Sequence, residues 1–235
     1  MNAFQPVHGI IFDKDGTLFD FTTTWEAWAR AFLLRLADGE EARAGILGKA
    51  IGFAFETSTF HKTSLVIAGT AAEIGAALAP HVPDLTSDKL LKIINEEAAH
   101  APQTEAVPLA PFLDDLRARG LKLGVATNDA EAPARAHLDA AGVVAHFDVI
   151  AGYDSGHGGK PAPGQLLAFC AATGLSPDNV IMVGDSLHDL RAGRAAGMRT
   201  LAVLTGMADT KDLAPHADAV LPDIGHIPAW LDQQA

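Results

Sequence analysis

Two acids near the start of the chain are the residues best placed to do chemistry. Asp13 and Asp15 follow directly on the apolar run 10–12, which is typical of a buried strand. Side chains alternate along a strand, so both carboxylates are expected on one face at its end. Two neighbouring carboxylates repel each other unless a cation compensates, and Mg²⁺ prefers carboxylate oxygens. Gly16 allows the chain to turn sharply just beyond the two acids. The pattern therefore predicts a metal-assisted site at the carboxyl edge of a sheet.

The elements that must position these acids alternate along most of the chain. We expect strands over 7–12, 121–126, 147–151, 180–183, 200–204 and 219–221. Helices are expected between them over 111–120, 132–141, 164–173 and 187–196. Such alternation predicts right-handed βαβ units and a parallel sheet. The predicted fold class is therefore α/β, with a Rossmann-like, doubly wound parallel sheet as the core.

A different pattern interrupts this alternation directly after the first strand. Residues 21–103 are rich in alanine and helical in pattern, with no convincing strand. Helices are expected there over 22–37, 70–79 and 87–99. We interpret this block as an inserted, all-helical cap domain. The core domain would then comprise residues 1–20 and 104–235.

The first helix of this block carries two recognisable signals. Thr23, with Glu26 three residues later, fits a capping box at the start of the helix expected over 22–37. Trp25 and Trp28 fall on its apolar stripe, where packing against other helices is the expected role.

Polar residues follow each of the next three strands of the predicted sheet. Thr127 and Asn128 follow the second strand, Lys160 follows the third, and Asp185 and Asp189 follow the fourth. Each has an ordinary explanation when taken alone, as a turn residue, a surface lysine or a helix cap. In open α/β sheets, however, ligands bind beyond the carboxyl ends of the strands. Acids, a hydroxyl and a lysine gathered at that edge indicate phosphoryl transfer.

Composition and charge narrow the class of protein. A chain of 235 residues can bury a sizeable core, and its net charge of −12 argues against nucleic acids and anionic membranes as partners. The single cysteine, Cys170, excludes an intrachain disulfide and a cysteine-rich zinc site. With no apolar stretch near the ~18 residues of a membrane helix and no basic leader, we expect a cytoplasmic enzyme, either a monomer or a homodimer.

Four motifs together give the chain a clear resemblance. They are Asp13-Lys-Asp15-Gly-Thr17, Val125-Ala-Thr127, Lys160-Pro161 and Gly184-Asp185-Ser-Leu-His-Asp189. In this order they resemble the haloacid dehalogenase-type hydrolases, most closely the phosphoglycolate phosphatase-like branch with a helical cap. One departure is Lys14, where relatives often carry an apolar residue. We expect its side chain to point away from both acids and to leave catalysis unaffected.

The resemblance implies roles for the acids and a Mg²⁺ cofactor. Asp13 would attack phosphorus and form an aspartyl-phosphate, while Asp15 would act as general acid and then as general base. The ion would be held by Asp13, the backbone carbonyl of Asp15, and Asp185. Asp189 would reach it directly or through water.

The resemblance also implies how a phosphoryl group would be held. Thr127, the backbone amide of Asn128, and Lys160 would contact the phosphoryl oxygens. A polar loop in the helical block contains His61 and Lys62. We expect these two side chains to face the active site and contact the organic part of the substrate, although an ordinary solvated loop is an equally good interpretation.

The second acid of the first motif separates the alternatives. Dehalogenases of this superfamily lack it, so its presence as Asp15 points to a phosphomonoester substrate. The partner would be a small phosphorylated metabolite, with phosphoglycolate as the family-level expectation. A phosphomutase of the same superfamily stays open as an alternative, as does a catalytically silent binding or regulatory relative.

Overall fold

The core of the molecule is a six-stranded parallel sheet. The computed structural model describes residues 6–234. The strands are β1 (Gly9–Phe12), β4 (Lys122–Ala126), β5 (Val149–Ala151), β6 (Val180–Gly184), β7 (Arg199–Val203) and β8 (Ala219–Leu221). Their order across the sheet is β5-β4-β1-β6-β7-β8, and every neighbouring pair is parallel. The predicted α/β class is confirmed, and each strand lies within two residues of its expected bounds.

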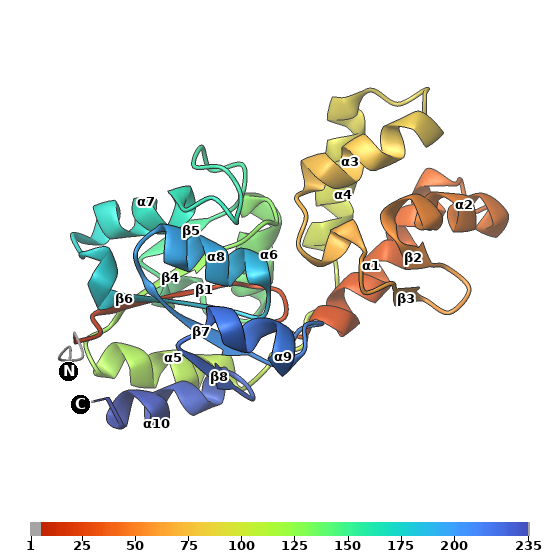
Figure 1. The fold of residues 1–235 in the computed structure, drawn as a ribbon. Coiled ribbons are helices and arrows are strands. Elements are labelled where there is room, and N and C mark those ends of the chain that lie inside the picture. Colours follow the sequence, from red (N-terminus) through yellow and green to blue (C-terminus); the bar gives the residue numbers. More distant parts are fainter. Residues whose placement is uncertain (1–5, 235) are drawn as a thin grey trace.

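Helices cover both faces of the sheet (Figure 1). They are α5 (Leu109–Ala118), α6 (Glu131–Ala140), α7 (Gly164–Thr173), α8 (Leu187–Ala195), α9 (Thr210–Leu213) and α10 (Ile227–Asp232). Residues of β1 show why two layers form: Ile10 and Phe12 pack with α5 and α10, whereas Ile11 packs with α7 and α8 on the opposite face. No helix within residues 6–234 has the length and apolar character needed to cross a membrane.

The helical block lies beyond one end of the sheet (Figure 1). Its helices are α1 (Phe21–Leu36), α2 (Glu41–Ile51), α3 (Ala71–Leu78) and α4 (Ser87–Ala99). They enclose a hydrophobic core of their own, in which Trp28 and Phe32 stack with ring centroids 4.9 Å apart. A small antiparallel hairpin, β2 (Phe53–Ala54) with β3 (Thr59–Phe60), also occurs in this block. Strands of two residues are too short to show alternation in a sequence.

The start of α1 differs from the sequence prediction. The predicted capping box of Thr23 and Glu26 is wrong, because Asp20 is the N-cap and its Oδ1 accepts from the backbone N–H of Thr23 at 2.7 Å. The backbone N–H of Asp20 also donates to the carbonyl of Thr104 at 2.8 Å. The two connections between the block and the sheet core therefore run side by side.

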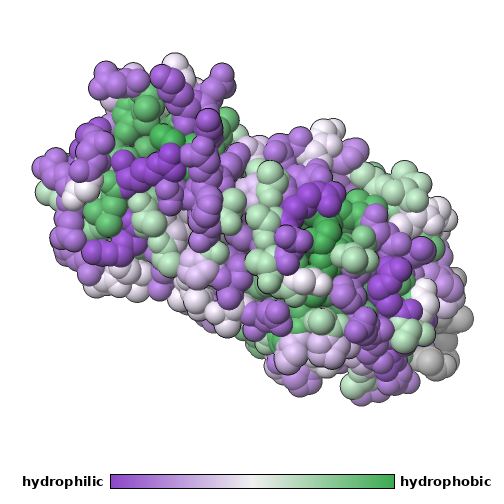
Figure 2. All heavy atoms as spheres, turned by 180° about the vertical axis from the view of Figure 1, so that it is seen from behind, coloured by the Kyte–Doolittle hydropathy of each residue, from purple (hydrophilic) through white to green (hydrophobic). Residues whose placement is uncertain are grey.

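Seen from behind, the molecule has two masses joined at a narrower waist (Figure 2). Polar residues dominate this face, with apolar residues showing in both masses. The predicted boundaries, 20/21 and 103/104, lie where the backbone of Asp20 pairs with that of Thr104. The division into two domains stays a prediction.

Candidate active site

Three carboxylates meet at the carboxyl edge of the sheet. Asp13 follows β1, Asp185 follows β6, and Asp189 lies in the first turn of α8; one oxygen of each lies within 4.8 Å of the others. β1 and β6 are neighbours, and the backbone N–H of Asp13 donates to the carbonyl of Val183 at 2.9 Å. Oxygen donors grouped in this way fit a hard divalent cation such as Mg²⁺.

The absence of a side chain at Gly16 allows the Asp185 carboxylate to lie against the turn that follows Asp15. Gly16 has φ of 79°, and a Cβ atom there would lie 2.5 Å from Oδ2 of Asp185. A side chain at this position would be strained and would collide with a metal-binding candidate. The hydroxyl of Thr205 donates to the Gly16 carbonyl at 2.6 Å, which fixes the turn from the loop after β7.

A buried lysine bridges two of the carboxylates. The Nζ atom of Lys160 lies 2.7 Å from Oδ1 of Asp13 and 2.6 Å from Oδ1 of Asp189. The side-chain amide of Asn128 holds the lysine's backbone: Oδ1 accepts from the Lys160 N–H at 2.8 Å, and Nδ2 donates to the Lys160 carbonyl at 2.9 Å. Nδ2 also donates to the carbonyl of Ala68 in the helical block at 2.8 Å.

Thr127, which follows β4, lies in the same pocket as the other site residues predicted for the sheet edge. Thr127 is buried, and its Oγ1 accepts from the backbone N–H of Asp129 at 3.0 Å. Gln165 on α7 donates to the Thr127 carbonyl at 2.9 Å. The structure thus brings Thr127 to the same pocket as Asp13, Asn128 and Lys160.

Burial and mutual repulsion set the electrostatics of this edge. Burial raises the pKa of Asp13 to about 7, with the charge of Lys160 opposing and the neighbouring acids reinforcing the shift. Burial and the charges of Asp189 and Asp13 hold the pKa of Asp185 well above its usual range. Burial alone would lower the pKa of Lys160, but Asp13 and Asp189 raise it. Three acids facing one cation leave a negative site that a divalent ion would balance.

Binding of Mg²⁺ should therefore depend on pH. Protons would compete with an ion at these acids, because Asp13, with a pKa of about 7, and Asp185 would have to be deprotonated to bind it. We expect Mg²⁺, at a concentration 100 times its Kd at pH ~8, to stabilise the fold by about 2.7 kcal/mol at that pH, and the same concentration to stabilise it clearly less at pH ~5.5. Thermal unfolding with and without Mg²⁺ measures this, and Asp185→Asn should remove the effect. Equal stabilisation at both pH values would contradict it.

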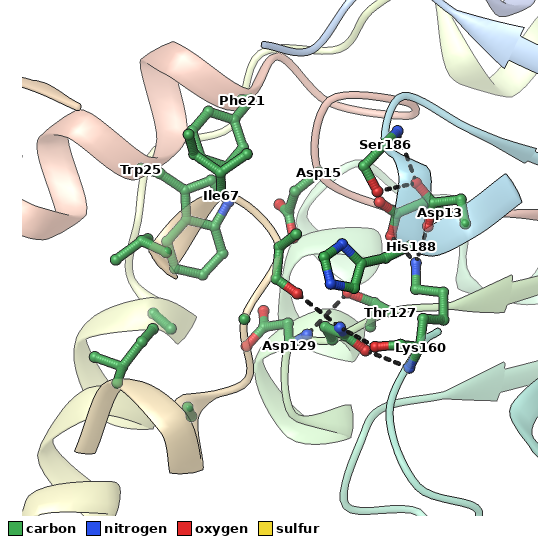
Figure 3. A pocket seen from close by; sticks show the side chains of 18 of the residues that line it. Asp13, Asp15, Phe21, Trp25, Ile67, Thr127, Asp129, Lys160, Ser186 and His188 are labelled. Atoms are coloured by element: carbon green, nitrogen blue, oxygen red, sulfur yellow. Dashed lines mark hydrogen bonds and ion pairs between the residues drawn. The ribbon is translucent and has the colours of Figure 1, made fainter. Parts of the chain in front are cut away.

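The pocket lies between the sheet edge and the helical block (Figure 3). Its core side is polar and includes Asp13, Asp15, Thr127, Asn128, Asp129, Lys160, Ser186, His188 and Asp189. The side formed by the block is largely apolar and is made by Phe21, Trp25, Val66, Ile67, Ala68, Gly69, Ala71, Ile74, Ile94 and Ala98. The polar side of the pocket, formed by the core, therefore faces an apolar wall formed by the helical block.

The structure places His61 and Lys62 outside this lining. Both are exposed, and Nζ of Lys62 lies 3.5 Å from Oδ2 of Asp209, on the surface of the core. The cause is local: β3 ends at Phe60, and the backbone N–H of His61 donates to the carbonyl of Gly52 in the hairpin. The segment 66–71 reaches the pocket instead.

The expectation that Lys14 points away from both acids is wrong. Its Nζ donates to Oδ1 of Asp15 at 2.6 Å, and the side chain is fully buried. Alternation of side chains holds only within a strand, and β1 ends at Phe12. Beyond the strand the chain bends at Lys14 and turns at Gly16, so strand alternation does not predict where the Lys14 side chain points.

Two residues that line the pocket, Asp129 and Trp25, were not predicted as site residues from the sequence. Asp129 was visible as a third polar residue after β4, yet nothing local showed that it faces the pocket. Trp25 does pack, edge-to-face with Trp28 at 5.1 Å, and it also lines the pocket. An apolar stripe does not reveal which of its members reaches a neighbouring domain.

Comparisons with known proteins agree with this geometry. The family model for haloacid dehalogenase-like hydrolases matches residues 7–197. A phosphoglycolate phosphatase from Nitrosospira multiformis is 30% identical, over 93% of each chain. The solved structure of a predicted phosphoglycolate phosphatase from Haemophilus somnus superposes with a TM-score of 0.73 at 20% identity, covering 95% of this chain and 97% of that one. The β-phosphoglucomutase from Clostridium difficile shares the fold at a TM-score of 0.68 and 17% identity, covering 97% of this chain and 96% of that one.

The acids, the lysine and the threonine at the sheet edge thus occur in a chain whose sequence matches one enzyme family over most of its length. The chain belongs to the haloacid dehalogenase-like hydrolases, and it is a phosphoric monoester hydrolase of the phosphoglycolate phosphatase-like branch.

Proposed function

We propose that the chain hydrolyses a small phosphomonoester through an aspartyl-phosphate on Asp13. The supporting observation is the bridge of Lys160 between Asp13 and Asp189, beside Asp185. An oxygen of Asp13 bonds to phosphorus while the bond to the leaving oxygen breaks, and Asp15 gives that oxygen a proton. Asp15 then takes a proton from the water that attacks the aspartyl-phosphate, which releases inorganic phosphate and restores Asp13. Lys160 offsets charge on the phosphoryl oxygens.

We propose that Mg²⁺ is held by Asp13, Asp185 and the backbone carbonyl of Asp15. When bound, it would neutralise phosphoryl charge. Asp189 would contact the ion through water, because its own oxygens already have donors: Oδ1 accepts from Lys160, and Oδ2 accepts from the Ser186 hydroxyl at 2.7 Å. Thr127 and the backbone amide of Asn128 would hold phosphoryl oxygens. The block 21–103 would serve as a cap domain that encloses the substrate.

The name of a relative and one unpaired hydrogen-bond donor in the pocket wall support the first substrate candidate. The curated relative carries the name phosphoglycolate phosphatase, which makes 2-phosphoglycolate the first candidate. Among the described lining residues Lys160 is the only lysine or arginine, and it already pairs with two acids. Trp25, however, is only 7% exposed, and its indole N–H has no hydrogen-bond acceptor among the described residues. We propose that it donates to an oxygen on the organic part of the substrate, such as a carboxylate oxygen.

Replacing Trp25 with phenylalanine tests this contact. Trp25→Phe keeps an aromatic ring but removes the donor, so kcat/KM for 2-phosphoglycolate should fall about 5- to 10-fold, the equivalent of one hydrogen bond. Ethyl phosphate, which lacks the carboxylate, should change by less than about twofold. An equal loss with both substrates would show that Trp25 only packs the wall. Absence of any phosphate release from either substrate in the unmodified protein would instead refute the proposed phosphatase activity.

The pocket favours a phosphatase over a phosphomutase. A mutase must bind an intermediate that carries two phosphoryl groups, and the second group would need a cation on the cap side of the site. The described wall formed by the helical block has none. A product assay on sugar phosphates distinguishes the two, because a mutase would yield an isomerised sugar phosphate and a phosphatase would yield free phosphate. The cytoplasmic location and the monomeric or dimeric state stay predictions.

A further inference from the structure

A fully buried lysine lies behind the second acid of the site. Lys14 has no exposed surface, and its Nζ has three partners: Oδ1 of Asp15 at 2.6 Å, Oδ2 of Asp129 at 3.3 Å and Nδ1 of His137 at 2.9 Å. These partners come from three separate segments, the loop after β1, the loop after β4, and α6. A buried ammonium group is costly unless it is paired and hydrogen-bonded, so each partner restricts where Nζ can lie.

The histidine in this cluster links the lysine to the helical block. Nδ1 of His137 accepts from the Lys14 ammonium group, because an ammonium group can only donate. Nε2 must then carry the hydrogen, and it donates to the carbonyl of Ala98 on α4 at 2.6 Å. Burial, reinforced by the charge of Lys14, lowers the pKa of His137 to about 4, which keeps the ring neutral. The ring of Trp25, on α1, also lies 5.6 Å from Nζ.

We propose that Lys14 is a positioning residue for Asp15, a proposal that rests on the proposed function. By binding Oδ1 of Asp15, it would leave Oδ2 to carry the proton toward the leaving group in the pocket. When the proton passes to the leaving oxygen, the electron pair of the broken P–O bond stays on that oxygen. Asp15 is left as a carboxylate 2.6 Å from the lysine ammonium group. Lys14 thus fixes the carboxyl group before the transfer and stabilises its charge afterwards.

Dependence on the leaving group separates this role from mere packing. A nitrophenolate leaves phosphorus with little need for a proton, whereas an alkoxide requires one. Damage to the placement of Asp15 should therefore slow the hydrolysis of alkyl phosphates much more than that of p-nitrophenyl phosphate. Damage to the fold or to phosphate binding should slow both equally.

The experiment compares kcat/KM of Lys14→Met on ethyl phosphate and on p-nitrophenyl phosphate, with Mg²⁺ present. Methionine keeps an unbranched stem and removes the charge. We expect a loss of about 10- to 100-fold on ethyl phosphate, the size of effect caused by misplacing a reacting group, and less than about threefold on p-nitrophenyl phosphate. Lys92→Met, the same change at a lysine whose side chain is 76% exposed, is the matched control and should change neither.

Two further variants make each outcome decisive. Asp15→Asn should show the same leaving-group dependence more strongly; if it does not, the proposed role of Asp15 fails, and with it the proposal for Lys14. Lys14→Met combined with Asp129→Asn removes one buried charge of each sign and serves if the single variant does not fold. Equal loss on both substrates, no loss on either, or failure of both variants to fold would overturn the proposal and leave Lys14 a structural residue.

Discussion

Replacing Asp13 with asparagine should abolish the hydrolysis of phosphomonoesters. Asparagine has the same shape but cannot form the acyl phosphate, and loss of a covalent nucleophile costs on the order of 10⁴- to 10⁶-fold in kcat. The fold should survive, because burial already disfavours the charged form of Asp13 and raises its pKa to about 7. The neutral amide should therefore leave the thermal midpoint of the metal-free protein unchanged or higher.

The measurement is phosphate release from 2-phosphoglycolate at saturating Mg²⁺, with thermal unfolding on the same preparations. Asp84→Asn, an identical change at an exposed residue of the helical block, is the matched control and should retain full activity. Turnover by Asp13→Asn within tenfold of the unmodified protein would rule out Asp13 as the nucleophile.

Replacing Lys160 with methionine should destabilise the metal-free protein strongly. Lys160 is 5% exposed and compensates Asp13 and Asp189, which its loss would leave buried and unpaired. Breaking a buried ion pair by removing one partner costs about 3–5 kcal/mol. Urea unfolding at about pH 8 measures this difference, with Lys92→Met expected within about 0.5 kcal/mol of the unmodified protein. Activity should be lost as well, because no lysine or arginine among the described lining residues would then offset charge on the phosphoryl oxygens.

The cost of Lys160→Met should shrink as the pH falls. The folded-state pKa of Asp13, about 7, lies above its ordinary value of 3.8, so the folded protein holds a proton that the unfolded chain releases. The charge of Asp13 therefore costs stability increasingly as pH rises from about 4 to above 7, and Lys160 limits that cost. Without the lysine, the difference in unfolding free energy should be larger at pH ~8 than at pH ~5.5. A difference that does not vary with pH would show that the lysine contributes packing rather than charge.

Much of the core could be predicted because its signals are local. The apolar run that ends at Phe12 is followed at once by Asp13, and the run that ends at Val183 is followed by Gly184 and then Asp185. The structure pairs these two positions in the parallel register of β1 and β6. Ligand-binding residues at strand ends are a property of the fold class, so recognising the strands was enough to gather Asp13 and Asp185 at one edge.

The parts that sequence could not supply depend on contacts between distant segments. Lys14 and His137 are 123 positions apart, and no spacing along the chain shows that they touch. The segment of the helical block that reaches the pocket could not be predicted either. The polarity of His61 and Lys62 suggested a binding loop, whereas the apolar segment 66–71 lines the site. A polar loop can be exposed to solvent as readily as it can bind a ligand.

The side-chain amide of Asn128 bears on how the enzyme could open. One of its N–H groups donates to Ala68 in the helical block, while its other contacts hold the backbone of Lys160. If the block moves away to admit substrate or release product, Asn128 loses only its bond to Ala68, worth about 1 kcal/mol, and keeps both of its contacts with Lys160. The lysine would keep its place throughout such a cycle. Each turnover would then begin with Lys160 already in place beside Asp13 and Asp189, and the helical block would close over them.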